Sequence, residues 1–119
     1  MPNITAAEWL LVLLRLPGKL PQPAGILLLD LNSDHLAVKL RTDIVLDDEG
    51  LAAFWGGLEL FLKAEAAEKG GQQVVEWLET ASHLVQLSDR NRIELTSGTH
   101  LEALENLYRK AVEASANSN

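Results

Sequence analysis

Five basic side chains are the first candidates for chemistry, because each lies in or next to a predicted strand. They are Arg15, Lys39, Arg41, Arg90 and Arg92. If two predicted hairpins are neighbours in one sheet, these cations converge on a small anion-binding or interface site. The alternative is a solvated strand face whose edge charges discourage aggregation between sheets, and we favour this alternative.

A group of acids follows the third predicted strand and could bind a divalent cation. Carboxylate oxygens are the ligands that Mg²⁺ and Ca²⁺ prefer, and the group comprises Asp43, Asp47, Asp48 and Glu49. It lacks the spacing of a calcium-binding loop. Acids at the start of a helix also stabilise that helix, because its N-terminus is positively polarised. We therefore predict helix capping rather than a metal site.

Other catalytic chemistries have little support. The three histidines, His35, His83 and His100, are too far apart to form a zinc-binding pair on one helix face. The absence of cysteine removes thiolate nucleophiles, disulfides and Cys-ligated metals. No G-x-S-x-G turn presents a serine. The pairs Gly56-Gly57 and Gly70-Gly71 do not lead from a strand into a helix as phosphate loops do. We predict no cofactor and no metal, and we identify no catalytic residue.

Composition and charge narrow the range of partners. The chain has 119 residues, of which 47% are hydrophobic, and its 17 acidic and 10 basic residues give a net charge of -7. This length accommodates one folded domain, residues 1–119. Nucleic acids and anionic membranes are bound by basic faces, so we exclude both as partners. The apolar run 9–14 is too short to span a membrane, and we expect a cytoplasmic protein.

The first third of the chain has the pattern of a three-stranded meander. Residues 8–16 and 25–31 are short, almost continuous apolar runs, and residues 35–41 alternate with the period of two that indicates a strand with one wet face. Asn32-Ser33-Asp34 forms the turn between the second and third strands. Leucine dominates these runs and favours helices over strands, so a helix over 8–16 is the alternative.

Two helices follow the meander. Apolar residues recur at helical spacing over 48–69 and again over 72–82, and Gly70-Gly71 separates the two helices. Gly56-Gly57 lies inside the first helix at a cost of roughly 1 kcal/mol per glycine relative to alanine. Such a cost is tolerable where a neighbouring element approaches closely.

The last part of the chain combines short strands and a helix. Residues 83–88 and 92–96 have strand patterns and form either a second hairpin or an extended excursion. A final helix spans 99–115, where Thr99 and Glu102 fit a capping box. The predicted fold class is therefore α+β.

The aromatic residues suggest a core and, secondarily, an interface. Trp9, Trp55 and Trp77 lie on three different predicted elements, and we expect them to share one aromatic cluster in the core. Tryptophan is also enriched in binding hot spots. Any of the three that lies at the surface is therefore a candidate interface residue.

Both faces of the first two predicted strands are apolar. In the first strand one face carries Leu10, Val12 and Leu14, and the other carries tryptophan and leucine as well. Strands of this kind need cover on both faces. Three helices on one side would leave the other side open, unless one helix crosses over or a second molecule covers it. We predict a dimer or an obligate partner on this ground.

Four segments of the chain resemble an uncharacterised bacterial family known only as a domain of unknown function. The opening strand has the family's aromatic, valine, arginine and proline residues at Trp9, Val12, Arg15 and Pro17. The family's G-V-V-L hairpin, L-Q-L-S strand and last helix are matched by segments 25–28, 84–88 and 104–108. Residues 20–24 depart from the family's charged approach to the glycine. The resemblance implies no established activity, but an association with kinase-like proteins implies a protein partner.

The function that we expect is protein–protein association by a small cytoplasmic protein, as a homodimer or as the accessory partner of a kinase-like or toxin-like protein. One alternative is an acidic secretion-chaperone-like dimer, although that class begins with a helix and a strand over 8–16 counts against it. Another is a small-molecule-binding or hydrolytic domain. Its cleft would combine Arg15, Lys39 or Arg41 with the acids of 43–49.

Overall fold

Five strands, three helices and one π-helical turn form the residues that the computed structural model describes, which are 4–81, 84–96 and 98–113. In chain order they are β1 (Ile4–Leu14), β2 (Gln22–Asp30), β3 (His35–Leu40), α1 (Glu49–Lys69), α2 (Gly71–Ala81), β4 (Val85–Leu87), β5 (Asn91–Thr96), α3 (His100–Tyr108) and the π turn η1 (Arg109–Glu113). This composition confirms the α+β class. His83 and the predicted end of the last helix at 115 lie outside the described residues.

The first three strands form the predicted antiparallel meander. Strand β2 lies between β1 and β3, with Leu10 opposite Leu27 in one ladder and Leu27 opposite Val38 in the other. The helical alternative for 8–16 is wrong. Strand β1 begins at Ile4, earlier than predicted, and β2 begins at Gln22, so the strand includes Pro23. The β1–β2 register shifts between Val12 and Leu13, beside this proline, which has no N–H to donate to the ladder.

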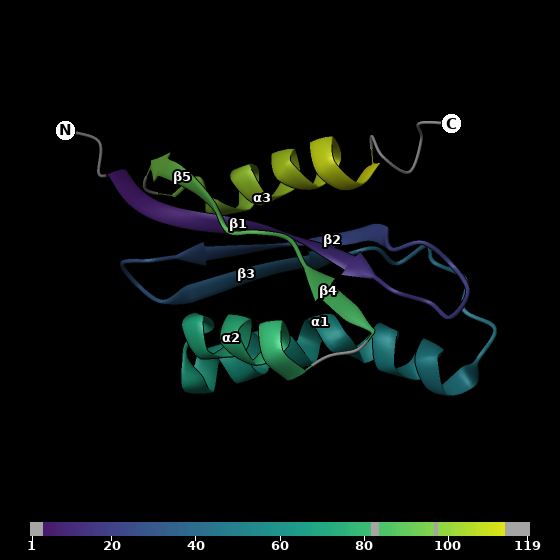
Figure 1. Ribbon diagram of the computed structural model, residues 1–119. Helices are drawn as coiled ribbons and strands as arrows, with labels where there is room; N and C mark the ends of the chain where they lie inside the picture. Colours follow the sequence, from purple (N-terminus) through teal and green to yellow (C-terminus); the bar gives the residue numbers. More distant parts are fainter. Residues whose placement is uncertain (1–3, 82–83, 97, 114–119) are drawn as a thin grey trace.

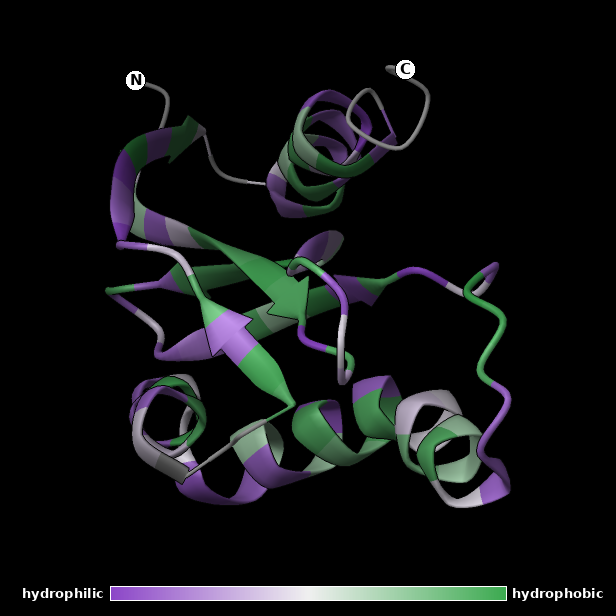
Figure 2. Ribbon diagram, turned by 45° about the vertical axis from the view of Figure 1, so that its right-hand side comes forward, coloured by the Kyte–Doolittle hydropathy of each residue, from purple (hydrophilic) through white to green (hydrophobic). Residues whose placement is uncertain are grey.

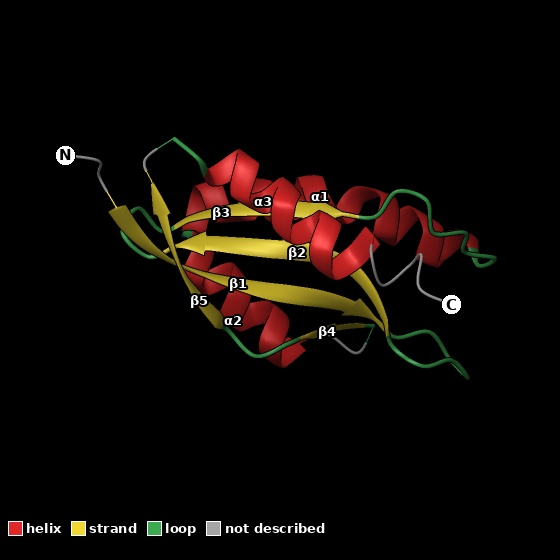
Figure 3. Cartoon of the chain, turned by 90° about the horizontal axis from the view of Figure 1, so that it is seen from above, coloured by secondary structure: helices red, strands yellow, loops and turns green. Residues whose placement is uncertain are grey.

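Strands β4 and β5 both pair with β1, so they form one interrupted strand rather than a hairpin. Leu87 lies opposite Val12, and Asn91 lies opposite Trp9. Three residues of the later segment, 88–90, therefore face two residues of β1, which is a β-bulge. The side chain of Ser88 keeps the ladder connected, because its Oγ accepts from the Leu11 N–H at 2.8 Å. Of the two predicted arrangements, the extended excursion is correct. Figure 3 shows β4 and β5 meeting β1 in succession.

The sheet is covered on both faces by helices of the same chain. Helices α1 and α2 lie along one face, and α3 lies along the other (Figure 1). Seven consecutive residues of β2, from Ala24 to Asp30, are buried as a result. This arrangement meets the need for cover on two faces through a helix that crosses over. The two-sided strands consequently give no independent support to a dimer.

Two apolar clusters fill the spaces on either side of the sheet. Figure 2 shows the central strands between them coloured mostly as hydrophobic. The cluster between the sheet and helices α1 and α2, which we call the α1–α2 core, includes Leu10, Leu27 and Leu62. The cluster against α3, the α3 core, includes Ile26, Leu28 and Tyr108. Neighbouring β2 residues therefore belong to opposite cores, which explains why this strand has no polar alternation.

Aspartate side chains cap the N-termini of α1 and α2, one from the adjacent residue and one from a distant turn. Asp48 is the N-cap of α1, and its carboxylate accepts from the Leu51 N–H at 2.9 Å, as the capping prediction requires. Asp34, in the β2–β3 turn with φ of 58°, caps α2 by accepting from the Gln72 N–H at 2.8 Å. The capping box at Thr99 is wrong. Its hydroxyl donates to the Thr96 carbonyl at 2.6 Å and makes no capping bond to α3.

The close approach of β2 and β3 at Gly25 yields a stability prediction. A Cβ atom at Gly25 would lie 2.7 Å from the Lys39 carbonyl oxygen, which is backbone and cannot swing away. We expect Gly25→Ala to lower the free energy of unfolding by about 1–3 kcal/mol through overpacking. Urea denaturation measures this change. The control is Gly56→Ala, where a Cβ meets no described atom within 4 Å; equal effects of the two substitutions would contradict the prediction.

Candidate functional site

Two of the predicted anion-binding residues, Lys39 on β3 and Arg41 directly after it, are ion-paired within the chain. The Lys39 Nζ donates to Glu105 at 2.7 Å and sits 4.7 Å from the centre of the Tyr108 ring. The Arg41 guanidinium makes two bonds of 2.9 Å to the Asp43 carboxylate. The hydrogen bond to Asp43 raises the pKa of Arg41 and lowers that of Asp43. Their positive charges are thus already partly neutralised.

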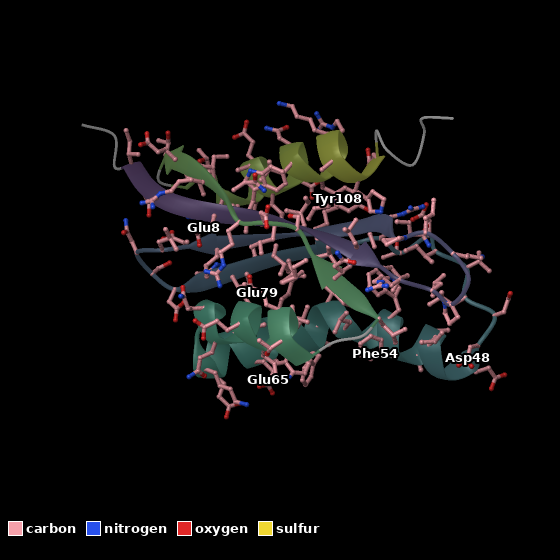
Figure 4. All side chains as sticks on the ribbon, in the orientation of Figure 1. Glu8, Asp48, Phe54, Glu65, Glu79 and Tyr108 are labelled. Atoms are coloured by element: carbon pink, nitrogen blue, oxygen red, sulfur yellow. The ribbon has the colours of Figure 1, made fainter. Side chains whose placement is uncertain are left out.

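The remaining candidates, Arg15, Arg90 and Arg92, lie away from β3, toward the edge of the sheet that β4 and β5 form. The Arg90 guanidinium, at the bulge, donates to Glu79 at 2.9 Å and to Glu8 at 3.2 Å, and these bonds keep its pKa above the ordinary value. Figure 4 labels both carboxylates, on α2 and β1. Arg15 and Arg92 are exposed. Because β3 and β5 are at opposite edges, the structure does not bring the five cations together.

The tryptophans do not share a cluster, which corrects the predicted aromatic core. Trp55 is buried in the α1–α2 core, where its Nε1–H donates to the Arg41 carbonyl at 2.8 Å. Trp9 is half-buried against the α3 core, on the opposite face of the sheet. Trp77 is 47% exposed on α2. The separation arises because Trp9 has the strand parity that points toward α3. By the criterion of exposure, Trp77 is the interface candidate.

A buried carboxylate, Asp30, joins three elements. It ends β2 with a side chain 9% exposed, and its Oδ2 lies 2.7 Å from Nε2 of His100 at the start of α3. Its Oδ1 accepts from the Thr5 hydroxyl of β1 at 3.0 Å and from the Asn32 N–H at 2.8 Å. The Thr5 hydroxyl therefore points at the carboxylate and not at the imidazole. This geometry is a structural clasp rather than an activated nucleophile.

The environment of Asp30 favours its ionised form. Burial alone raises the pKa of the carboxyl, but hydrogen bonds from the Ser33 N–H, His100, the Asn32 N–H and Thr5 outweigh burial and lower the pKa to about 2. The ordinary value is 3.8. Ionised Asp30 therefore stabilises the fold fully above about pH 4, and this contribution is lost as the pH falls toward 2.

This clasp predicts an acid-sensitive fold. Asp30→Asn should lower the free energy of unfolding at pH 7 by about 2 kcal/mol, since one pKa unit corresponds to roughly 1.4 kcal/mol. The variant should also lose less stability than the wild type between pH 4 and pH 2. Urea denaturation at several pH values measures both effects. Asp43→Asn, at a carboxylate whose side chain is 70% exposed, is the control and should change little; a wild type equally stable at pH 4 and pH 2 would rule the mechanism out.

No metal site emerges from the acids and histidines that the structure describes, where no group of three or more could hold a metal ion. No helix in the described ranges is long and apolar enough to cross a membrane. The most conspicuous surface feature is instead an apolar one, on the outward side of α1 and α2.

Over residues 50–62, helix α1 is largely apolar on its outward side as well as on its buried side. Within residues 50–62 the only charged residue is Glu59. Its carboxylate turns to the sheet edge and accepts from the Leu40 N–H at 2.8 Å. Leu60 is 75% exposed, and Phe54 and Phe61 are 42% and 47% exposed. Figure 4 labels Phe54 on this helix, on the side of the sheet opposite Tyr108. A helix that is apolar all round is normally buried on all sides.

Trp77 extends this surface across a groove between the helices. Its ring centre lies 6.1 Å from that of Phe61, and both rings line an open groove of about 640 Å³. Leu62 and Val74 contribute to the groove, and Glu65 and Glu76 also line it. We call the surface formed by Phe54, Leu60, Phe61 and Trp77 the aromatic patch.

The glycines beside this patch have no packing reason within the chain. Gly56 and Gly57 are exposed, and a Cβ atom on either would meet no described atom within 4 Å. The condition under which we called their cost tolerable, the close approach of a neighbouring element, is therefore not met in the described part of the chain. Two glycines in the middle of a helix are destabilising, and their absence of side chains leaves the backbone open to close approach from outside.

We expect Gly57→Ala to stabilise the isolated chain. Alanine lowers the entropy of the unfolded state and meets no obstacle here, so the free energy of unfolding should rise by about 0.5–1 kcal/mol. The midpoint of urea denaturation measures this gain. Ala53→Gly, on the same exposed side of α1, is the reverse control and should lose a similar amount. A loss of stability in Gly57→Ala would show that a close neighbour exists.

The sequence contained a signal for the aromatic patch that helical periodicity obscured. Six apolar residues of α1 fit one stripe by their spacing, yet two of them, Phe54 and Phe61, lie on its exposed margin. The six are Leu51, Phe54, Trp55, Leu58, Phe61 and Leu62. The more telling signal is the lack of charge over 50–62, because an ordinary surface helix has a polar outer face.

Comparisons with family models, with curated proteins and with solved structures find no match to this chain.

Proposed function

We propose that this chain acts by protein–protein association and that the aromatic patch is its docking surface. The observation that carries the proposal is the low charge of α1 over residues 50–62, where Glu59 is the one charged residue, together with the exposed ring of Trp77. The three exposed aromatic side chains, at 42%, 47% and 47% exposure, present roughly 200–350 Å² of surface, given about 150–250 Å² for each whole side chain. The largest apolar patch on a typical monomer measures about 300–600 Å² and is often functional, and the aromatic patch approaches this size.

The charges around the patch indicate the chemistry of the partner. Helix α2 has two glutamates and no basic residue, and Glu76 lines the groove without an ion-pair partner among the described residues. The one cation in the groove, Lys69, pairs with Glu65 at 3.0 Å. An apolar helix flanked by basic residues complements this groove, because its anchors would enter between the aromatic rings and its cations would meet the acids.

The two other functions have less support. Strand β1 counts against the secretion-chaperone-like alternative, and the dispersal of Arg15, Lys39 and Arg41 counts against a small-molecule cleft built from them. An accessory role beside a kinase-like or toxin-like protein, a cytoplasmic location and the resemblance to the uncharacterised bacterial family stay predictions.

Site-directed photo-crosslinking tests the docking surface. A benzophenone side chain at Leu60 should give a discrete cross-linked adduct in cells that express the chain, whereas the same group at Glu102, exposed on α3, should not. Adding Phe61→Ser and Trp77→Ser should reduce the adduct roughly tenfold or more, as expected for hot-spot residues. Both side chains are about half exposed, so circular dichroism should show the fold retained.

Equal adducts at the two positions, or an adduct that survives the double substitution, would contradict the proposal. The mass of the adduct identifies the occupant, since a second copy adds 13.0 kDa. If the Leu60 adduct has this mass, the occupant of the aromatic patch is a second copy of the chain and not a basic helix.

A further inference from the structure

Among the described residues, β5 pairs only with β1, so its other edge presents unpaired backbone hydrogen-bonding groups. Even-numbered residues of β1 bond to β2, as the Leu31 N–H donating to Ala6 shows, so odd-numbered residues of β1 bond to β4 and β5. Ile93 lies opposite Ala7, and its backbone groups therefore face β1. The backbone N–H and C=O groups of Arg92 and Glu94 consequently point outward. An edge of this kind can template pairing with another strand.

The two side chains at this edge are exposed and carry opposite charges. Arg92 and Glu94 have neither an ion-pair partner nor a side-chain hydrogen bond within the part of the chain that the structure describes. The neighbouring Arg90, by contrast, is bonded to two carboxylates. The charges of Arg92 and Glu94 are thus available to a partner.

We propose that β5 pairs with β5 of a second copy of this chain, antiparallel and about a two-fold axis at Ile93. In this register Arg92 lies directly opposite Glu94 of the second copy, and Glu94 lies opposite Arg92. The outward backbone groups of both residues meet their counterparts, because residues directly opposite in an antiparallel pair exchange both hydrogen bonds. The same two side chains therefore form two symmetric ion pairs.

The order of charges selects this register over its neighbours. Moving the axis to Arg92 places two guanidinium groups opposite each other, and moving it to Glu94 places two carboxylates opposite each other. Like charges directly opposite are destabilising in a sheet. A general edge-protecting role needs charges of either sign in any order, whereas the sequence Arg-Ile-Glu is complementary to itself.

The apolar surface beside β5 supports the same arrangement. Ile93 is half-buried, and with Leu95, Ala103 and Leu107 it lines an open groove of about 380 Å³ between β5 and α3. Pairing brings the two Ile93 side chains together at the axis, on the α3 side of both sheets. The two grooves then become continuous, which removes apolar surface from water. This dimer is independent of the aromatic patch and of the partner proposed for it.

Charge-reversal variants in sedimentation equilibrium test the pairing. The wild type should self-associate between about 1 μM and 1 mM, a range that covers weak to moderate interfaces. R92E and E94R each make both cross-strand pairs like-charged, so each should weaken the dimer roughly tenfold or more. The double variant R92E/E94R reverses the order of charges and should restore dimerisation. An equimolar mixture of R92E and E94R should form heterodimers, because every pair is then attractive.

These two rescues separate lost pairing from lost folding, since a misfolded single variant would not recover in the mixture. A wild type that stays at 13.0 kDa over the whole range overturns the proposal. So do single reversals that leave the dimer unchanged. If F61S/W77S abolishes self-association and R92E does not, the dimer forms through the aromatic patch and the β5 edge is not the interface. If the wild type dimerises but the benzophenone at Leu60 gives no cross-linked adduct, the docking function of the aromatic patch is contradicted and the β5 dimer is not.

Discussion

The structure depends on one constraint, which is that β1 and β2 are apolar on both faces. A strand of this kind is stable only when both faces are removed from water. Helices α1 and α2 can cover one face because they follow the meander directly. The other face is reached only by a helix that passes the sheet edge, and β5 carries the chain to that position before α3 begins. The crossing of α3 is therefore a consequence of the composition of two early strands.

Polar contacts attach helix α3 to the face of the sheet that it covers. Asp30 closes the second strand and bonds to His100, the first residue of α3, while Lys39 reaches Glu105 one helical turn later. These bonds tie the helix to the two strands that it covers. Outside both cores, α1 and α2 carry the exposed aromatic rings of Phe54, Phe61 and Trp77. The fold leaves these apolar side chains in contact with water, and this exposure is the basis of the docking surface that we propose.

Local patterns predicted most of the elements, while the long-range relations required the structure. The meander, α1 with its Asp48 cap and the break at Gly70 follow from residues close together in the sequence. The pairing of β4 and β5 with β1 does not, because it depends on a bulge at 88–90. Thr99 had the residue type of a cap, but its hydroxyl found the nearer Thr96 carbonyl.

The candidate site was harder to predict than the fold. The five cations were grouped on the assumption that two hairpins are neighbours, and strand order decides that question. The exposed rings of Phe61 and Trp77 belong to residue types that usually indicate a core, so residue type alone assigned them inward. Only the position of each helix against the sheet distinguishes the buried margin from the exposed one.

The pairing of β1 with β5 has a consequence for the nascent chain. Ile4 lies opposite Thr96, so one edge of the first strand is completed by a segment that leaves the ribosome long after it. Until then the meander and the first two helices can assemble, because their contacts are closer in sequence. During that interval Ile26 and Leu28 have no helix over them. The partly synthesised chain thus exposes an apolar sheet face that α3 later buries.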